Sequence, residues 1–277
     1  MKAAAGAAPI DRVVIVTGAS SGIGRATALR LAAAGCTVVL AARRVGELDA
    51  LRARIAAAGG TAFAVPTDVT RSDDLDRLVA EALSVSGRID GLVNVAGVGH
   101  AHSIMSPDPV VEQMLATNLM APIRLMAPIR LMRAVIPIMR SQRHGAIVNI
   151  GSLAGEIGVQ GPYSATKFGL RGITDSVRRE LAGSGIGVTL IEPGYIATPL
   201  TANRSGHMPG PDIVARAVQA ALLKPRRRVI VPRRFHLIVF LTRTFPGLID
   251  RRFAGKAADP AWTPSSAGAA TAPVEPS

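Results

Sequence analysis

Tyr163 and Lys167 lie four residues apart in the sequence YSATK, and this pair of residue types could carry out acid–base catalysis. If this segment is helical, the two residues share one face of the helix, one turn apart. A phenol is a poor acid or base at neutral pH, but a nearby ammonium favours its ionised form and so makes general acid–base catalysis accessible. Ordinary solvated helices also carry this spacing. The pair therefore indicates catalysis only if the rest of the chain builds a site around it.

A glycine-rich turn near the start of the chain indicates where a cofactor could bind. The β-branched run Arg12–Val16 predicts a buried strand, the turn Thr17–Gly24 (TGASSGIG) follows it, and a helix-like segment comes next. In this context Gly18 allows a tight turn, Gly22 lets the backbone approach a pyrophosphate, and Gly24 allows close packing of the helix on the strand. The helix N-terminus would then offer its N–H groups to the phosphates. A turn that needs glycines only for its own shape is the alternative.

The end of the second predicted strand, Thr37–Ala41, carries two basic side chains. A dinucleotide-binding fold that prefers NAD usually has an acid here, which binds the ribose hydroxyls. This chain has Ala42 followed by Arg43 and Arg44. A guanidinium can bind a 2′-phosphate through several donors, whereas an acid would repel it. The sequence therefore predicts NADP(H), with Arg43 as the stronger candidate. Two solvated arginines that open the next helix are the alternative.

The remaining segments alternate between strand-like and helix-like patterns. Further strands are predicted at 61–65, 91–95, 146–150, 187–191 and 229–231, and helices at 45–58, 72–85, 163–181 and 212–223. Strands that alternate with helices form a parallel, doubly wound sheet, whose ligands bind at the carboxyl ends of the strands. The chain is therefore predicted to be an α/β protein with one such domain over residues 11–231.

Polar side chains stand at or near the ends of these elements. Asp68 follows the third strand, where it could contact an adenine or could cap the helix that begins near Ser72. Ser152 follows the fifth strand, eleven residues before Tyr163. Asn118 lies within the predicted helix 110–118, where a small polar side chain gains little stability, so we expect a functional or kinked position there.

The loop at 98–109 contains two histidines, His100 and His102. Their spacing could suit a metal ion, but no carboxylate or cysteine stands beside them. We therefore expect a solvated or substrate-facing loop and no metal site.

A six-residue sequence, APIRLM, occurs twice in succession, at Ala121–Met126 and Ala127–Met132. Six residues turn a helix by about 600°, which leaves an offset of about 120° between the two copies. Pro122 and Pro128 each remove a helical donor as well. We therefore expect a kink, bulge or shifted segment here rather than one smooth helix.

Composition narrows the class of protein. Apolar residues make up 48% of the 277 residues, which indicates a globular chain. The single cysteine, Cys36, excludes an internal disulfide and fits a reducing compartment. The first residues lack the apolar core of a signal peptide, and no stretch approaches the ~20 apolar residues of a membrane-spanning helix. These features favour a cytoplasmic protein.

The positive charge is concentrated near the C-terminus. Lys224–Lys256 holds ten Lys or Arg residues and one acid, a local charge of +9, so the rest of the chain carries only +4 of the formal +13. This distribution argues against a general nucleic-acid-binding surface and for a local anionic partner. Within it, the basic apolar segment 232–253 could lie on an anionic membrane surface, or it could cover an apolar cleft or form a dimer contact. Residues 1–10 are expected to form a flexible arm, and residues 254–277 a disordered tail.

Taken together, these motifs resemble those of the short-chain dehydrogenase/reductase family. The resemblance runs from Asp11 to Thr198, and more weakly to Val231. It rests on TGASSGIG, NVAG, Asn118, Ser152, YSATK and PGYIAT, which occur in the family's order. It implies a single Rossmann-like domain with the strand order 3-2-1-4-5-6-7.

The resemblance also implies roles for individual residues. Tyr163 would be the general acid/base, and Lys167 would assist it and hold the nicotinamide ribose. Ser152 would donate a hydrogen bond to the substrate oxygen, and Asn118 would hold a water molecule that links Lys167 to solvent. The implied cofactor-binding residues are Gly18, Ser20, Ser21, Gly22, Ile23, Gly24, Arg43, Arg44, Asp68, Val69, Asn94, Ala96, Gly97, Tyr163, Lys167, Pro193, Gly194, Ile196 and Thr198.

Two features depart from the family pattern. Val95 stands where the family often has a second asparagine, and we expect only mild effects. The APIRLM duplication follows Asn118 in the helix that usually forms the family's dimer interface, so it would disturb a homodimer of that type.

The expected function is an NADP-dependent oxidoreductase that interconverts a carbonyl and a secondary alcohol on a lipophilic substrate, and a membrane surface is one place where it could act. The alternatives are a 3-oxoacyl thioester reductase, whose acidic carrier would meet the basic segment, and a non-catalytic NADP-binding scaffold.

Overall fold

A computed structural model describes residues 12–97, 127–158, 160–202 and 205–247, together with 108–109, 112 and 250–251. Its centre is a seven-stranded parallel sheet with the order β3-β2-β1-β4-β5-β6-β7, which confirms the predicted fold and strand order. The strands are β1 Val13–Thr17, β2 Thr37–Ala42, β3 Thr61–Pro66, β4 Gly91–Asn94, β5 Gly145–Ile150, β6 Ile186–Pro193 and β7 Arg228–Val231. The predicted strands agree with these to within a few residues at their ends.

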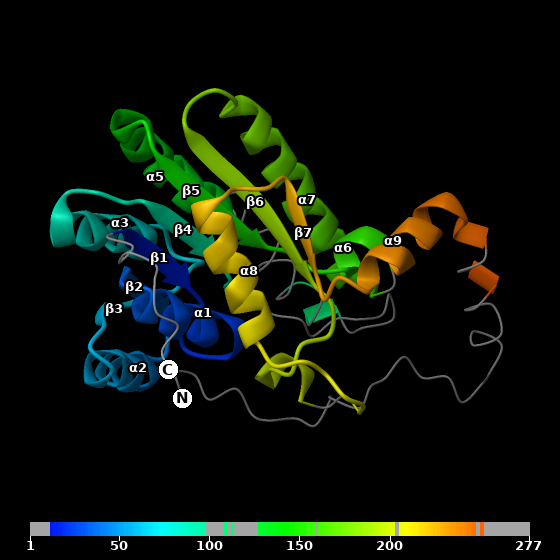
Figure 1. Ribbon diagram of the computed structural model, residues 1–277, viewed down its shortest axis with the longest axis horizontal. Helices are drawn as coiled ribbons and strands as arrows, with labels where there is room; N and C mark the ends of the chain where they lie inside the picture. The colour runs from blue at the N-terminus through cyan, green and yellow to red at the C-terminus, as the bar shows by residue number, and fades with distance from the viewer. Residues whose placement is uncertain are drawn as a thin grey trace.

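Helices cover both faces of the sheet (Figure 1). They are α1 Gly22–Ala33, α2 Val45–Ala57, α3 Ser72–Ser86, α5 Ala127–Gln142, α6 Ala154–Ile157, α7 Gly161–Glu180, α8 Asp212–Leu223 and α9 Phe235–Thr244. Apolar side chains of α1, α2 and α8 form one buried cluster with the sheet, and those of α3, α5 and α7 form another. Because both faces are covered, the central strands are mostly apolar, and β1 (VVIVT) is buried at every position.

The order of the strands reverses beside β1, which pairs with β2 on one side and with β4 on the other. Ligands of doubly wound sheets bind at this point, outside the carboxyl ends of the strands. The turn after β1 and the segment after β4 meet here, because a Cβ added to Gly18 would lie 3.0 Å from the backbone nitrogen of Ala96. The fold therefore places the glycine-rich turn at the predicted binding edge.

The second copy of the repeated sequence opens helix α5. Leu131 and Met132 of this copy are fully buried and continue into the core with Val135 and Met139. The second copy therefore supplies the apolar face that packs on the sheet. The first copy, with Pro122, lies outside the described residues, and so do the predicted helix 110–118, the histidines of the preceding loop, the arm 1–10 and the tail 254–277.

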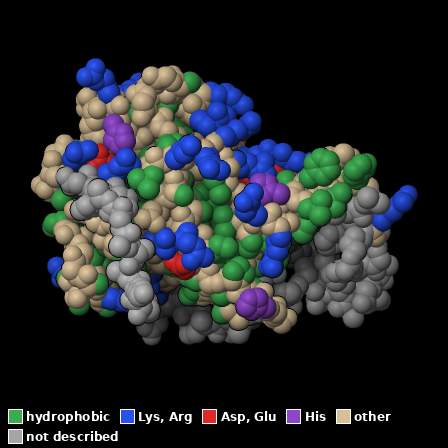
Figure 2. All heavy atoms as spheres, viewed as in Figure 1, with side chains coloured by type: hydrophobic (Ala, Val, Ile, Leu, Met, Phe, Trp, Pro, Cys, Tyr) green, Lys and Arg blue, Asp and Glu red, His purple; other side chains and the backbone are tan. Residues whose placement is uncertain are grey.

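Helix α9 stands beyond the carboxyl end of the sheet, next to α6 (Figure 1). It lies within the basic apolar segment 232–253. Hydrophobic side chains gather over this part of the molecule on the face that Figure 2 shows, and Lys and Arg side chains lie around them. Of the helices in the described parts of the chain, none combines the length and the apolar character needed to cross a membrane.

Candidate active site

Tyr163 and Lys167 lie one turn apart on α7, as their spacing predicts. Both are largely buried, at 8% and 9% exposure. The Lys167 Nζ lies 5.6 Å from the centre of the Tyr163 ring and donates a hydrogen bond to the backbone oxygen of Ile150 at 3.4 Å. That carbonyl ends β5, so the sheet itself holds the ammonium beside the phenol.

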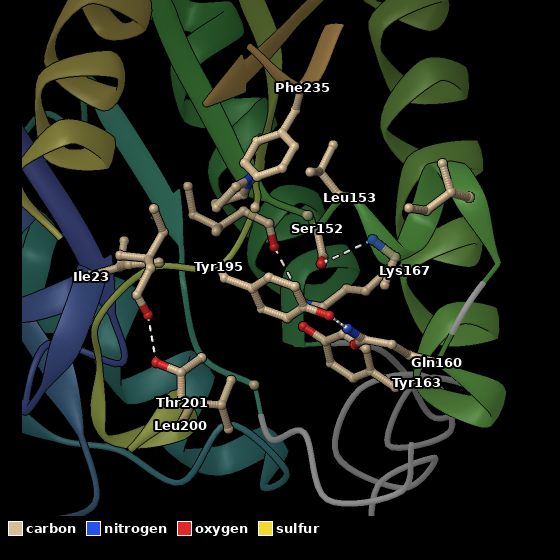
Figure 3. Close-up of a pocket in the computed structure, with 18 of the residues that line it drawn as sticks. Ile23, Ser152, Leu153, Gln160, Tyr163, Lys167, Tyr195, Leu200, Thr201 and Phe235 are labelled. Atoms are coloured by element: carbon tan, nitrogen blue, oxygen red, sulfur yellow. Dashed lines mark hydrogen bonds between the residues drawn. The ribbon is translucent and has the colours of Figure 1, made fainter. Parts of the chain in front are cut away.

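Ser152 follows β5 and faces the same space (Figure 3). Its Oγ accepts a hydrogen bond from the backbone N–H of Ala154 at 3.1 Å, which leaves its own O–H available to donate to a ligand. The segment that follows Ser152 packs closely on α7, because a Cβ at Gly155 would lie 2.8 Å from the backbone carbonyl of Lys167. This close contact fixes Ser152 relative to the Tyr163–Lys167 pair.

A cavity of about 400 Å³ opens in front of these three residues. Its other walls are mainly apolar and include Ile150, Leu153, Ile157, Pro193, Ile196, Phe235, Ile238 and Val239. The fourth predicted catalytic residue, Asn118, lies outside the described residues. Within those residues, His, Cys, Asp and Glu side chains form no group of three that could hold a metal ion.

Several cavity residues were not predicted from the sequence. Gln160 Nε2 donates a hydrogen bond to Tyr195 Oη at 3.1 Å, and this contact joins the start of α7 to the turn after β6 (Figure 3). On α9, Phe235, Val239 and Thr242 recur at the spacing of one helical face and line the cavity. The spacing of these three residues indicates a helix that packs through one face, but it does not identify what that face packs on.

A second hollow, a groove of about 430 Å³, runs past the glycine-rich turn. Gly18 and Gly22 both have positive φ angles, 66° and 50°, which L side chains rarely adopt. A Cβ at Gly24 would lie only 2.1 Å from the carbonyl oxygen of Gly18, so α1 packs directly on the turn. Ser21 is the N-cap residue but makes no side-chain capping bond, so the first N–H groups of α1 remain available for an anion.

Most of the predicted cofactor residues lie along the groove, the cavity or both. The groove is lined by Gly18, Ser20, Ser21, Gly22, Ile23, Arg43, Arg44, Asp68, Val69, Ala96, Gly97 and Thr198. The cavity is lined by Tyr163, Lys167, Pro193, Gly194 and Ile196, and Ile23, Gly97 and Thr198 border both hollows. An elongated ligand in the groove would therefore reach Tyr163.

The two arginines after β2 are exposed at one end of this groove. Arg44 Nη2 donates a hydrogen bond to Ser20 Oγ at 3.0 Å, which holds its guanidinium beside the glycine-rich turn. Asp68 lies nearby, and its carboxylate accepts hydrogen bonds from both the backbone N–H and the hydroxyl of Thr70. The alternative that Asp68 caps the next helix is wrong, because Arg71 occupies the N-cap position of α3.

Asn94 and Gly24 line neither hollow. Asn94 is buried beneath the site, where its Nδ2 donates to Asn149 Oδ1, and Asn149 in turn donates to Thr174 on α7. Thr17, at the end of β1, accepts hydrogen bonds from the backbone N–H groups of Val95 and Ala96. These buried contacts fix β4, β5 and α7 against one another, so they position the site from below.

A buried charge cluster lies behind the cavity wall. Glu156 on α6 is fully buried and contacts Arg171 at 2.9 Å, Arg228 at 2.8 Å and Arg243 at 2.6 Å. Arg228 also pairs with Glu192 of β6. Burial, with a further contribution from the neighbouring Glu156, raises the pKa of Glu192 to about 8. No local sequence pattern indicates this cluster, which ties α9 to α6 and β7.

The groove and the cavity together fit a nicotinamide dinucleotide. The helix N-terminus and the glycine-rich turn suit a pyrophosphate, and the exposed guanidiniums at one end suit a further phosphate. At the other end, the phenol, the hydroxyl and the ammonium face an apolar space. Such a site can exchange a proton with the oxygen of a carbonyl or alcohol next to a hydride donor or acceptor.

Comparisons with known proteins agree with this interpretation of the site as that of an oxidoreductase. A family model described as short chain dehydrogenase matches residues 12–208. An uncharacterized oxidoreductase, YxnA, of Bacillus subtilis is 34% identical over 87% of this chain and 71% of its own length. A 3-oxoacyl-[acyl-carrier-protein] reductase of Synechocystis is 41% identical over 69% of this chain and 77% of its own. A crystal structure of a metagenomic short-chain oxidoreductase in complex with NADP, 33% identical, superposes with a TM-score of 0.69 over 81% of this chain and 98% of that one.

Proposed function

The chain belongs to the short-chain dehydrogenase/reductase family, and from that premise we propose that it is an NADP-dependent oxidoreductase that interconverts a ketone and a secondary alcohol on a lipophilic substrate. The observation that carries this proposal is the apolar cavity in front of Tyr163, one wall of which is helix α9.

The described residues divide the chemistry between them. Ser152 donates a hydrogen bond from its hydroxyl to the substrate oxygen and keeps its proton, while a lone pair of its Oγ accepts the hydrogen bond from Ala154 N–H. Tyr163 gives a proton to that oxygen during reduction and takes it during oxidation. The Lys167 ammonium, buried 5.6 Å from the ring centre, stabilises negative charge on the phenol oxygen while the proton moves. The nicotinamide cofactor, when bound, supplies or accepts the hydride.

The walls of the cavity support a lipophilic substrate. Leu153, Ile157 and Val239 present hydrocarbon to the space, and Ser152 and Tyr163 present hydroxyl groups to it. A substrate with one oxygen and an apolar body would place the oxygen on these two residues and its body against the hydrocarbon wall. Burying each CH₂ group contributes about 0.8 kcal/mol, or about fourfold in affinity.

A series of methyl ketones of increasing chain length tests this proposal. With NADPH as reductant, kcat/KM is expected to rise about fourfold for each added methylene until the cavity of about 400 Å³ is filled. A value that is flat or falling with chain length would rule out the apolar cavity as the binding site for the substrate body.

The variant Tyr163→Phe tests the role of the phenol. It removes only the hydroxyl, so kcat is expected to fall by ~10²–10⁴ while NADPH binding stays within about threefold of the wild type. The matched control is Tyr195→Phe, which removes the other tyrosine hydroxyl that lies at the cavity and should lower kcat far less. If the wild type binds NADPH but reduces no carbonyl, and Tyr163→Phe changes nothing, the chain is a non-catalytic cofactor-binding protein.

Preference for NADP is supported by the two arginines at the groove and by the absence of an acid at the end of β2. A charge-assisted hydrogen bond contributes ~1.5–3 kcal/mol. Arg43→Ala is therefore expected to weaken NADPH about 10- to 150-fold and NADH less than threefold. Arg54→Ala, an exposed arginine on α2 outside the groove, is the control. Equal affinity of the wild-type protein for NADPH and NADH would refute this proposal.

A second candidate is reduction of a 3-oxoacyl thioester. The 41% identity to a 3-oxoacyl-[acyl-carrier-protein] reductase favours it. However, that match covers about as much of the chain as the family domain at 12–208 alone, so it gives no account of the wall formed by α9. A comparison of acetoacetyl thioesters with simple ketones of equal chain length separates the two. A preference above 100-fold for the thioester would replace the proposed function.

A further inference from the structure

Helix α9 has two apolar faces, and the cavity uses only one of them. Phe235, Val239 and Thr242 face the cavity. Leu237 and Phe240 lie on the opposite side of the helix, since each residue turns the chain by about 100°. Their side chains are 64% and 59% exposed.

This exposure is unusual for such a helix. A helix that is apolar on nearly every side is normally buried on every side. Leu241 and Phe245 are exposed next to Leu237 and Phe240, so the outer face forms a continuous apolar patch. Figure 2 shows hydrophobic side chains gathered over α9. The four residues Leu237, Phe240, Leu241 and Phe245 are called the outer patch below.

Basic side chains border the outer patch. Arg233 and Arg234 precede α9, Arg251 follows it, and all three are exposed. None of the three forms an ion pair with another described residue, and the only acid in the sequence of segment 232–253 is Asp250, next to Arg251. The Arg234 guanidinium lies 5.3 Å from the ring centre of Phe235, so its charge stays at the start of the helix. The patch therefore combines exposed hydrocarbon with an excess of positive charge.

The helix is held in this orientation from below. Arg243 points to the buried Glu156 at 2.6 Å, and Val239 packs with Leu153 and Ile230 in a small buried cluster. These contacts fix the inner face, so the outer patch cannot turn inward without breaking them. The apolar side chains are thus presented to the surroundings by a rigid support.

We propose that the outer patch docks α9 on the surface of an anionic lipid bilayer. The ten residues of α9 span about 15 Å, which is half of a bilayer's hydrocarbon core, so the helix would lie in the interface and not cross it. Hydrocarbon of the patch would enter the boundary between headgroups and acyl chains, and the bordering arginines would meet the anionic headgroups.

Docking in this orientation would place the substrate cavity directly behind the bilayer surface, because the same helix forms its wall. A lipophilic substrate dissolved in the membrane could then enter from the lipid side. This last step rests on the proposed function, whereas the binding of α9 to the bilayer does not.

Flotation with vesicles, measured without substrate, tests the docking. The full chain is expected to float with vesicles of phosphatidylglycerol and phosphatidylcholine, and at least tenfold less with phosphatidylcholine alone. Raising the salt concentration from 0.1 M to 1 M shortens the Debye length from about 10 Å to about 3 Å and should release most of the bound protein.

Two double variants separate the contributions of charge and hydrocarbon. Arg233→Ser with Arg234→Ser is expected to lower the partition coefficient about 25-fold, since a basic residue at an anionic surface contributes roughly fivefold. Leu237→Ser with Phe240→Ser should lower it tenfold or more. The matched controls are Arg54→Ser with Arg140→Ser, which removes two exposed charges from α2 and α5, and Phe63→Ser, which removes an exposed ring from β3.

Three outcomes would overturn the proposal. Vesicle binding could be absent at every salt concentration, or it could be equal for the α9 variants and their controls. Light scattering could instead show that Leu237→Ser with Phe240→Ser converts a dimer to a monomer, which would assign the patch to a second copy of the chain. Reduction of a short, water-soluble ketone without vesicles should be unchanged in both α9 variants, so failure of docking is distinguishable from failure of the proposed function.

Discussion

The packing of Gly24 allows a direct test of the phosphate-binding turn. In the variant Gly24→Ala, the new methyl carbon would lie 2.1 Å from the carbonyl oxygen of Gly18 and 2.6 Å from its carbon. Both atoms belong to the backbone, so no side chain can turn away. An ordinary contact of a Cβ needs about 3.4 Å or more, so the turn and the start of α1 must separate by more than 1 Å.

This separation should affect both binding and stability. A displacement of about 1 Å at a positioning element can cost ~10²-fold, and overpacking a dense interior costs ~1–3 kcal/mol. We therefore expect the Kd for NADPH to rise about 100-fold, and the free energy of unfolding to fall by about 1–3 kcal/mol. Intrinsic fluorescence or calorimetry measures the Kd for NADPH, and urea denaturation measures the free energy of unfolding.

Gly172 provides the matched control. It lies within α7, and a Cβ added there meets no atom within 4 Å. Gly172→Ala should therefore leave cofactor binding unchanged and stabilise the protein by about 0.5–1 kcal/mol, because alanine loses less entropy in a helix. If Gly24→Ala binds NADPH within threefold of the wild type, the close packing of α1 on the turn does not shape the cofactor site.

Three further predictions concern the wall behind the cavity. In the folded protein Glu192 keeps its proton up to about pH 8, whereas in the unfolded chain it releases the proton near pH 4.5. The free energy of unfolding should therefore fall as pH rises between these values, by at most about 1.4 kcal/mol per pH unit. Glu192→Gln should abolish this pH dependence, which urea denaturation at several pH values measures. Glu156→Gln should lower the free energy of unfolding by about 3–5 kcal/mol, because it removes the buried carboxylate from the partly buried guanidiniums of Arg171 and Arg228. Arg243→Gln, at a half-exposed side chain, should cost about 1 kcal/mol, and equal losses would contradict the assigned burial. Gly194→Ala would place a methyl group 2.3 Å from the Phe235 ring, so KM should rise for long-chain ketones but not for acetone.

The fold was predictable because local patterns and packing agree along most of the chain. Buried parallel strands such as β1 must be apolar on both faces, so the sequence marks them clearly. Glycines at Gly18 and Gly24 are required by backbone contacts that few other residues could tolerate, which makes the turn readable from the sequence. The order of the seven strands followed from the family resemblance, and the structure confirms it.

The cavity walls were less predictable, because they depend on contacts between distant segments. Tyr195 follows β6, whereas its hydrogen-bond partner Gln160 precedes α7. Glu156 gathers guanidiniums from α7, β7 and α9, which are separated by 72 residues between Arg171 and Arg243. Local periodicity does not indicate contacts between segments that are distant in the sequence, so these residues resembled ordinary surface positions.

The residue types and their spacing in the sequence were enough to predict the chemistry. Tyr163 and Lys167 must share a helical face wherever α7 lies, and the turn after β1 must offer its N–H groups to an anion, because both features depend only on neighbouring residues. The tertiary fold sets what surrounds that chemistry. It turned one face of α9 toward Tyr163 and left the other exposed, because Arg243 reaches a carboxylate that the fold had buried in another part of the chain.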